Sequence, residues 1–154
     1  FGEERASRKI AKAIVDFRNR TPIDSTTQLA KIISKAKPSY KQDIHPATKT
    51  FQAFRIFINH ELDEIRDALP KATDVLCKGG RLVAISFHSL EDRIVKRFMR
   101  DQSKPKEQPI ELPILRDKSD IKLKIIGKKI RPTSNELSKN HRARSALLRI
   151  AERI

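Results

Sequence analysis

The stretch RLVAISFHSLEDRIVKRF, residues 81–98, decides the fold class of this chain. Its first seven residues are nearly all apolar, and a pair of glycines precedes them. A short apolar run without alternation is typical of a strand covered on both faces, as in a parallel sheet. The run ends at a histidine and a serine, and helical spacing of apolar residues begins at once. The stretch therefore predicts a strand over 81–87, a turn, and a helix over 89–100.

The turn between this strand and this helix has two interpretations. Ser89 suits the N-cap of the helix, and Asp92, three residues on, suits the acid of a capping box. In that interpretation His88 is a structural hydrogen-bonding residue. Alternatively the turn faces a ligand, because open parallel sheets bind ligands outside the carboxyl ends of their strands. A helix N-terminus at that place also favours a phosphate or a polar base edge.

The segment before this strand carries the strongest helix signal. Residues 45–69 hold one continuous apolar stripe, made of Phe51, Phe54, Ile58, Leu62, Ile65 and Leu69. Thr48 is the expected N-cap after the turn at His45-Pro46, and Pro70 is expected to kink or break the helix. The helical pattern resumes as far as Cys77, which we therefore expect in the core.

Two shorter helices are expected near the beginning of the chain. Residues 3–19 place apolar side chains at helical spacing with basic residues on the other faces. A second helix follows, capped by Ser25, Thr26 or Thr27, and ends at Lys37-Pro38. This front piece is small and basic, so we expect it to pack against another element.

The segments after the helix predict a loop and two strands. Residues 101–120 hold prolines amid charges and indicate an irregular surface loop. Residues 121–130 alternate apolar residues with lysine and predict a strand, and residues 134–136 suit a short helical turn. Residues 144–154 form either a closing strand or a short helix. We favour the strand, because it can pair antiparallel with 121–130, and the succession of elements indicates an α/β fold.

The charge of the chain bears on its partners. Lys and Arg number 34 against 19 acidic residues, a formal net charge of +15. Such an excess favours polyanionic partners, although a basic surface without a specific partner explains it equally well. The candidate basic surface combines one side of the helix over 89–100 with later arginines: Arg93, Lys96, Arg97, Arg100, Arg142, Arg144 and Arg149.

Other classes of site find little support in the sequence. The single cysteine rules out an internal disulfide framework and fits a reducing compartment, so we expect a cytoplasmic protein. No apolar run is long enough to span a bilayer, and we expect no membrane partner. The four histidines are scattered, so no metal site is predicted.

Three stretches together resemble a known family. They are HPATKTFQAFRI (45–56), GGRLVAISFHSLEDRIVKRF (79–98) and NHRARSALLRIAER (140–153). They resemble the small-subunit 16S ribosomal RNA methyltransferase H family, bacterial cytosine-N4 methyltransferases that use S-adenosylmethionine. RPTSNEL (131–137) and FGEERASRKIAKAIV (1–15) are similar to further segments of the family, so the resemblance runs along the whole chain.

Four residues depart from the pattern of this family. Lys49 stands where arginine is usual, and Lys78 and His141 each replace a proline. Pro70 interrupts a helix that is usually unbroken. None of these changes removes a group to which we assign chemistry, although Lys49 and His141 could alter contacts with RNA.

The resemblance implies an architecture. The chain would be the carboxyl-terminal half of such an enzyme: the second half of a class I (Rossmann-like) methyltransferase sheet, in residues 48–154, plus part of a helical insertion, in residues 1–47. The first half of the sheet would be absent from this chain. The three expected strands would be neighbours, with the final one in the middle. The strand over 81–87 would then be an edge that self-associates or pairs with an amino-terminal fragment.

The resemblance also implies a function. The whole enzyme would transfer a methyl group from S-adenosylmethionine to N4 of a cytidine in 16S rRNA, with the small ribosomal subunit as its partner. The cofactor-binding residues would lie in the missing half, so this chain alone is expected to be inactive, and no catalytic residue is assigned. The expected RNA- or substrate-binding residues are His45, Thr48, His88, Ser89, Arg93, Arg142 and Arg144.

Within that set the roles differ. His88 and Ser89 would shape the side of the pocket that receives the target base, and Arg93, Arg142 and Arg144 would hold the RNA backbone.

Two other classes of function compete with this interpretation. A non-catalytic basic RNA-binding, ribosome-associated protein would share the charge, but it has no reason to carry the His-Ser turn. A helix-turn-helix DNA-binding protein built from residues 3–35 is disfavoured, because its turn at 20–25 is long and contains proline.

Overall fold

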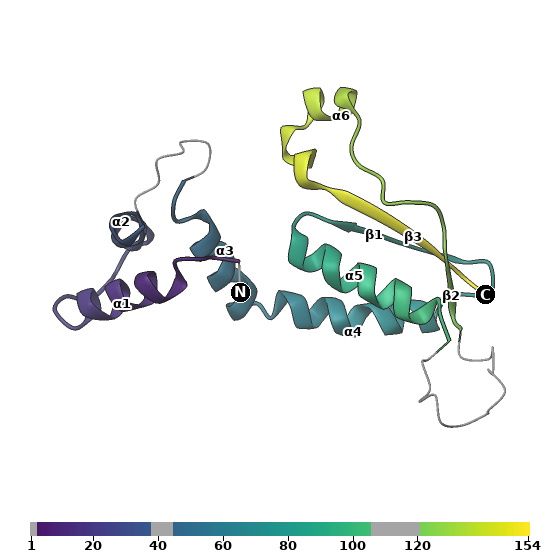
Figure 1. Cartoon of the computed structure of the whole chain (residues 1–154), viewed down its shortest axis with the longest axis horizontal. Helices are drawn as coiled ribbons and strands as arrows, with labels where there is room; N and C mark the ends of the chain where they lie inside the picture. The colour runs from purple at the N-terminus through teal and green to yellow at the C-terminus, as the bar shows by residue number, and fades with distance from the viewer. Residues whose placement is uncertain (1–2, 38–44, 106–120) are drawn as a thin grey trace. The chain divides into compact units, whose positions relative to one another are not determined.

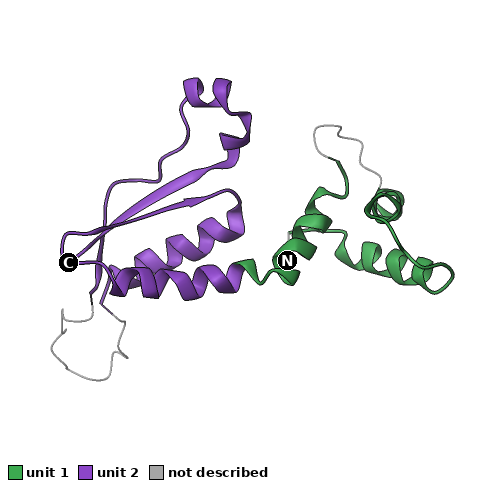
Figure 2. Cartoon of the chain, turned by 180° about the vertical axis from the view of Figure 1, so that it is seen from behind, with its two compact units in different colours: residues 1–61 green, residues 62–154 purple. Residues whose placement is uncertain are grey.

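The computed structural model of the 154-residue chain describes residues 3–37, 45–105 and 121–154. The chain forms two compact units, residues 1–61 and 62–154, coloured green and purple in Figure 2. Each unit is described by itself. Most of the loop predicted over 101–120 falls outside the described residues.

The first unit is helical, as predicted. It contains α1 (Ser7–Arg18), α2 (Thr26–Ala36) and α3 (Thr48–Ile58). Its core is formed by Ile10, Ile33 and Ala47, all at most 2% exposed. Ser25 is confirmed as the N-cap of α2, since its hydroxyl accepts a hydrogen bond from the Gln28 amide at 3.1 Å.

An ion pair holds the residues before α1 to the end of α2. Glu4 Oε2 lies 2.7 Å from Lys37 Nζ, and the Glu4 side chain is only 4% exposed. Burial raises the pKa of Glu4, but the hydrogen bonds from Lys37 and from the Ala6 amide outweigh it, and the net effect lowers this pKa.

Thr48 is not the N-cap of α3, so that prediction was wrong. Ala47 occupies the cap position without a side-chain hydrogen bond, and Thr48 is the first helical residue. The preceding turn supplies the missing acceptors, because His45 Nδ1 accepts from the Ala47 amide at 3.2 Å and the His45 carbonyl accepts from the Thr48 amide at 3.0 Å. His45 thus takes the role that a capping threonine would play.

The apolar stripe predicted as one helix belongs to two helices, α3 and α4 (Glu61–Asp74). Between them Asn59 is the C-cap of α3, and His60 has φ of 53°, in the left-handed region that commonly follows a helix end. The stripe divides accordingly, because Ile58 is 70% exposed whereas Leu62 and Leu69 are buried. Periodicity alone could not show the break, since the two interrupting residues preserve the spacing.

The predicted break at Pro70 and the predicted burial of Cys77 were also wrong. Pro70 lies inside α4, which continues to Asp74. The buried side chains of Leu69 and Thr73 hold the helix on both sides of the proline. Cys77 lies beyond the helix and is exposed, so it is not part of the core.

The second unit contains a three-stranded sheet with the order β1-β3-β2 (Figure 1). Its strands are β1 (Arg81–Ser86), β2 (Leu123–Ile125) and β3 (Leu147–Arg153). Both outer strands pair antiparallel with β3. The middle position of the final strand and its antiparallel pairing with the segment predicted over 121–130 are confirmed.

One face of this sheet is covered by helices. α5 (Ser89–Gln102) follows β1 and, together with α4, packs on the sheet (Figure 1). The core between them consists of Leu69, Val95, Met99, Leu123 and Ala151.

Within the described residues the opposite face of the sheet is open, so the coverage on both faces expected from the apolar run is not seen there, whereas the edge position expected for the strand over 81–87 is confirmed. Within the part of the chain that the structure describes, β1 pairs only with the antiparallel β3, and Val83 and Ile85 are 51% and 58% exposed. β1 is apolar on both of its faces, but the described residues place helices on only one face of the sheet.

Two short helical segments precede β3. α6 (Ser134–Lys139) confirms the predicted helical turn and is capped by Thr133, whose hydroxyl accepts from the Glu136 amide at 3.2 Å. The 3-10 helix η2 (His141–Ser145) then leads directly into β3.

A bidentate ion pair joins α5 to β3. Arg149 Nε and Nη2 donate to Asp92 Oδ1 and Oδ2 at 2.7 and 3.0 Å. The two side chains are 18% and 15% exposed. The hydrogen bond from Arg149 lowers the pKa of Asp92, and burial opposes this only in part. Asp92 therefore serves the packing of α5 in place of the predicted capping box with Ser89, and Arg149 is committed to it.

Replacing Asp92 by asparagine should destabilise the protein by about 1–3 kcal/mol at neutral pH, because it leaves a shielded guanidinium without its counter-charge. The pKa of Asp92 is lower in the folded state than the unfolded value of about 3.9. The stabilisation is therefore complete above that value and is lost as the pH falls through the folded-state pKa. Urea unfolding of the wild type and Asp92→Asn at several pH values measures this.

Asp63→Asn is the matched control, since Asp63 pairs with Arg66 on the exposed surface of α4 with side chains 66% and 55% exposed. Exposed pairs contribute little, so its effect should stay below about 0.5 kcal/mol. Equal losses for the two variants would contradict the structural role of the Asp92–Arg149 pair.

Candidate nucleic-acid interface

The register of the sheet gathers most of the predicted site at one end of the strands, where β1 ends and β3 begins. We call this end the sheet edge. Ser86, at the end of β1, pairs with Leu147, at the start of β3. α5 begins just after β1, and η2 ends just before β3, so both lie at this end of the sheet (Figure 1). Five predicted residues share this sheet edge: His88, Ser89, Arg93, Arg142 and Arg144.

His88, and not Ser89, is the N-cap of α5. Its backbone is extended, and its Nδ1 accepts a hydrogen bond from the Glu91 amide at 3.4 Å. In return Glu91 Oε2 accepts from the amides of Phe87 and His88 at 2.8 and 3.2 Å. These bonds form a reciprocal capping box. Ser89 is the first residue of the helix, and the structural interpretation of the histidine is confirmed.

The second ring nitrogen of His88 is buried beside the Glu91 carboxylate. The side chain is 14% exposed, and Nε2 lies 3.2 Å from Glu91 Oε1 but is not aligned for a hydrogen bond. Because Nδ1 acts as an acceptor, a neutral ring carries its proton on Nε2. Within the described residues this buried donor has no hydrogen-bond partner. Contact of His88 with a ligand stays a prediction.

The arginines of the sheet edge are placed by local structure. In η2 the Asn140 side chain accepts a hydrogen bond from the Arg142 amide at 3.1 Å, and Ala143 is 4% exposed. Ala143 anchors the short helix, while Arg142 and Arg144 on either side of it are exposed. Arg93 is also exposed, one turn into α5. The edge therefore presents guanidinium groups, which suit phosphate oxygens.

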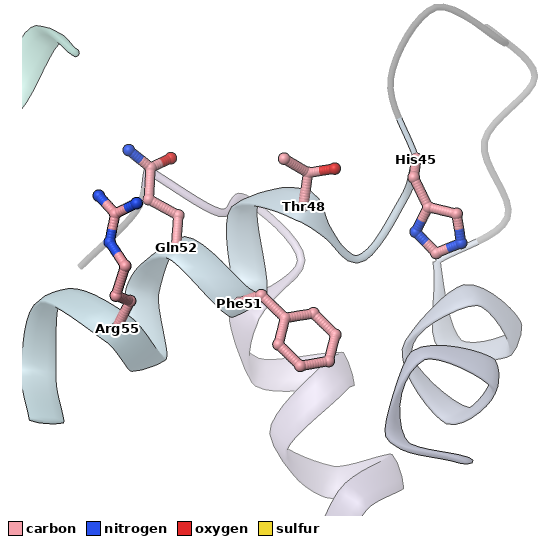
Figure 3. Close-up of a pocket in the computed structure, with 5 residues that line it drawn as sticks. All are labelled: His45, Thr48, Phe51, Gln52 and Arg55. Atoms are coloured by element: carbon pink, nitrogen blue, oxygen red, sulfur yellow. The ribbon is translucent and has the colours of Figure 1, made fainter. Parts of the chain in front are cut away.

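The two remaining predicted residues, His45 and Thr48, belong to the first unit. They line an open groove of about 480 Å³ together with Phe51, Gln52 and Arg55 (Figure 3). Four of these side chains come from α3, and His45 comes from the turn before it.

Sequence reasoning missed Gln52 and Arg55. The spacing of Thr48, Gln52 and Arg55 along one helix face is the signal that could have found them. Among the described residues that line the groove none is acidic, although Arg55 Nε lies 2.8 Å from Glu61 Oε1. The groove can therefore offer neutral hydrogen-bonding groups and a partly neutralised guanidinium.

Among residues 3–37, 45–105 and 121–154, no cluster of three or more His, Cys, Asp or Glu side chains is arranged to hold a metal ion. The strand-to-helix turn of the sheet holds Phe87 and His88 and no glycine. This turn does not form a glycine-rich cofactor loop.

None of the described helices combines the length and the apolar composition needed to cross a bilayer.

Comparison with known proteins identifies relatives of the whole chain. Proteins named "Ribosomal RNA small subunit methyltransferase H" from Marinomonas sp. (strain MWYL1) and Coxiella burnetii (strain Dugway 5J108-111) are each 53% identical over 154 residues. The protein of that name from Legionella pneumophila (strain Paris) is 49% identical. The matches cover 100% of this chain and 49–50% of the relatives. The chain thus spans about half the length of these curated relatives.

The model of the MraW methylase family matches residues 1–154, which is every residue of the sequence. Together with these identities, the match shows that the chain belongs to the MraW methylase family.

Proposed function

We propose that this chain is one half of an RNA methyltransferase that transfers a methyl group from S-adenosylmethionine to N4 of a cytidine in 16S rRNA. The observation that carries the proposal is the match of the MraW methylase family along all 154 residues. The relatives' name, ribosomal RNA small subunit methyltransferase H, supports the substrate class. Because the chain spans about half of these relatives, the activity belongs to the whole protein, and its proposed location is the cytoplasm.

The sheet supports a place for the chain in such an enzyme. β1 and β2 both run antiparallel to β3 and therefore point in the same direction, and β1 is an edge strand. Its exposed Val83 and Ile85 offer an apolar surface. We propose that residues 48–154 are the carboxyl-terminal half of a Rossmann-like class I domain, and residues 1–47 part of a helical insertion. The remaining half, or a second copy of the chain, would pair along β1.

The reaction defines what this chain has to do. S-adenosylmethionine supplies the methyl group. The lone pair of the cytosine amine is partly delocalised into the ring, so methyl transfer requires alignment of that nitrogen. The turn between β1 and α5 holds no glycine-rich loop, so the cofactor would be held by the other half of the protein, and the described residues would bind and orient the RNA.

The sheet edge is suited to that share. The capped turn at His88 and Ser89 is rigid, because the capping box fixes both its backbone and its ring. The turn holds the His88 ring, with its buried Nε2, beside the helix N-terminus. The ring would form the target-base side of the pocket. The exposed arginines Arg93, Arg142 and Arg144 would hold phosphates, a contact that positions RNA without reading its sequence. His45 and Thr48 would add contacts from the groove of the first unit.

Incubation of the whole protein with small ribosomal subunits and labelled S-adenosylmethionine tests the function. We expect transfer to a cytidine of 16S rRNA, identified as N4-methylcytidine by mass spectrometry of the nucleosides. The 154-residue chain alone should transfer no label. Salt-sensitive binding of rRNA by the whole protein without any methyl transfer would instead support a non-catalytic RNA-binding protein.

A pair of His88 variants separates its two roles. Asparagine is a favoured N-cap, whereas alanine costs about 1 kcal/mol of cap stability. If the ring contacts the substrate, His88→Asn and His88→Ala should both lower kcat/KM for methyl transfer by about tenfold or more in the whole protein.

The thermal midpoint distinguishes the alternatives, because only His88→Ala should lower it. Full methylation and unchanged RNA binding by His88→Asn would restrict His88 to a structural role.

A further inference from the structure

The segment that follows β2 contains a two-residue bulge. Ile126 donates its amide to the Ile150 carbonyl at 3.0 Å, and Ile130 and Leu148 exchange two hydrogen bonds of 2.9 Å. From Ile126 to Ile130 this segment advances by four residues, whereas the opposite stretch of β3, from Ile150 to Leu148, advances by two. The segment therefore carries two extra residues that have no partner on β3. Gly127 has φ of 66°, a left-handed conformation that glycine adopts without strain. We call residues 127–129 the lysine bulge.

Both lysines of the bulge are exposed, and the structure gives neither an ion-pair partner within the described residues. The bulge lies near α5. The pKa of Asp92 is lowered mainly by its hydrogen bond to Arg149, and the charges of Lys129 and Lys96 lower it further. Lys129 is therefore within electrostatic reach of the first turn of α5, close to the sheet edge that carries the arginines.

The charge of the second unit is segregated. Residues 121–149 hold nine basic residues and a single acidic one, Glu136, whereas α4 holds five acidic residues and two basic ones. The nine are Lys122, Lys124, Lys128, Lys129, Arg131, Lys139, Arg142, Arg144 and Arg149. Lys122 and Arg149 pair with Asp74 and Asp92, and the other seven basic residues leave this segment with an excess of positive charge that favours a polyanion.

The lysines of the segment over 121–149 differ in whether an acidic side chain balances their charge. Lys122 lies 2.9 Å from Asp74 of α4, so its charge is already balanced. The charges of Lys128 and Lys129 are not balanced in this way. The bulge is anchored on both sides by strand hydrogen bonds, so its backbone is ordered before a partner binds. Lysines on an ordered backbone lose less entropy on binding than lysines on a flexible tail would.

We propose that the lysine bulge is a docking element for the phosphate backbone of the RNA substrate. It extends the surface of Arg142 and Arg144 away from the sheet edge. An ammonium group is a point charge without the planar fork of arginine, so the bulge positions RNA and does not read bases. This inference rests on the proposed function, since it takes rRNA as the polyanion.

The test compares the whole protein with its Lys128→Ala/Lys129→Ala variant in binding to small-subunit rRNA at several salt concentrations. Each lost phosphate contact reduces the slope of log K against log salt by about 0.7–0.9, so the double variant should lose about 1–2 units of slope. Affinity near 0.1 M salt should fall about tenfold. KM for methyl transfer should rise with kcat unchanged, because the bulge does not touch the reacting atoms.

Two matched variants control for charge and for folding. Lys128→Arg/Lys129→Arg keeps both charges and should keep the salt slope. Lys122→Ala/Lys124→Ala removes the same formal charge from the preceding strand, where Lys122 is balanced by Asp74, and should change the slope by less than half as much.

The outcomes separate the two proposals. A wild-type protein that methylates rRNA, with an alanine variant of the bulge that keeps its salt slope and KM, would overturn the docking element alone. A wild-type protein that neither binds nor methylates rRNA would overturn the proposed function itself.

Discussion

The pairing of β1 with β3 is the constraint on which the site depends. Six residue pairs, from Arg81 with Glu152 to Ser86 with Leu147, set a register that places the end of one strand beside the start of the other. The amides of Gly79 and Arg153 extend the ladder with two hydrogen bonds of 2.8 Å. α5 begins just after β1 and η2 ends just before β3, at the same end of the sheet. The segments that carry His88, Arg93, Arg142 and Arg144 therefore meet at this end although they are distant in the sequence. A register slip of one residue would turn every core side chain of β3 to the open face.

Packing holds α5 on one face of the sheet, and the charge of the second unit differs between its segments. The core around Val95 and Met99 and the Asp92–Arg149 pair hold the helix on one face. Within the described residues the other face of β1 is open and apolar, which suits a strand that further helices would cover. Within the second unit α4 is acidic and the segment over 121–149 is basic, so the positive charge of this unit is gathered in the segment where phosphates would bind.

Much of the fold could be predicted from the sequence, and the misses have physical causes. Helical spacing located most of the helices, and the resemblance to a family placed the last strand in the middle. The cap of α5 was assigned to Ser89 because histidine is an uncommon cap, although Glu91 stands at the spacing that a capping box at His88 requires. The break at His60 was missed because a left-handed histidine leaves no mark on periodicity. The groove itself was not predicted: His45 and Thr48 were selected because they lie in a stretch that resembles a family, and Gln52 and Arg55, which line the groove with them, were missed.

The most direct measurement of the central claim is disulfide formation across the sheet edge in the whole protein, with exposed Cys77 replaced by serine. Directly paired residues of antiparallel strands have Cα atoms about 4.5–5.5 Å apart, within the range that a disulfide spans. The account predicts that Ser86→Cys with Leu147→Cys forms a disulfide on mild oxidation, whereas Ser86→Cys with Leu148→Cys does not. Efficient bonding of the second pair, or none of the first, would show that the end of β1 and the start of β3 do not share the edge on which the site depends.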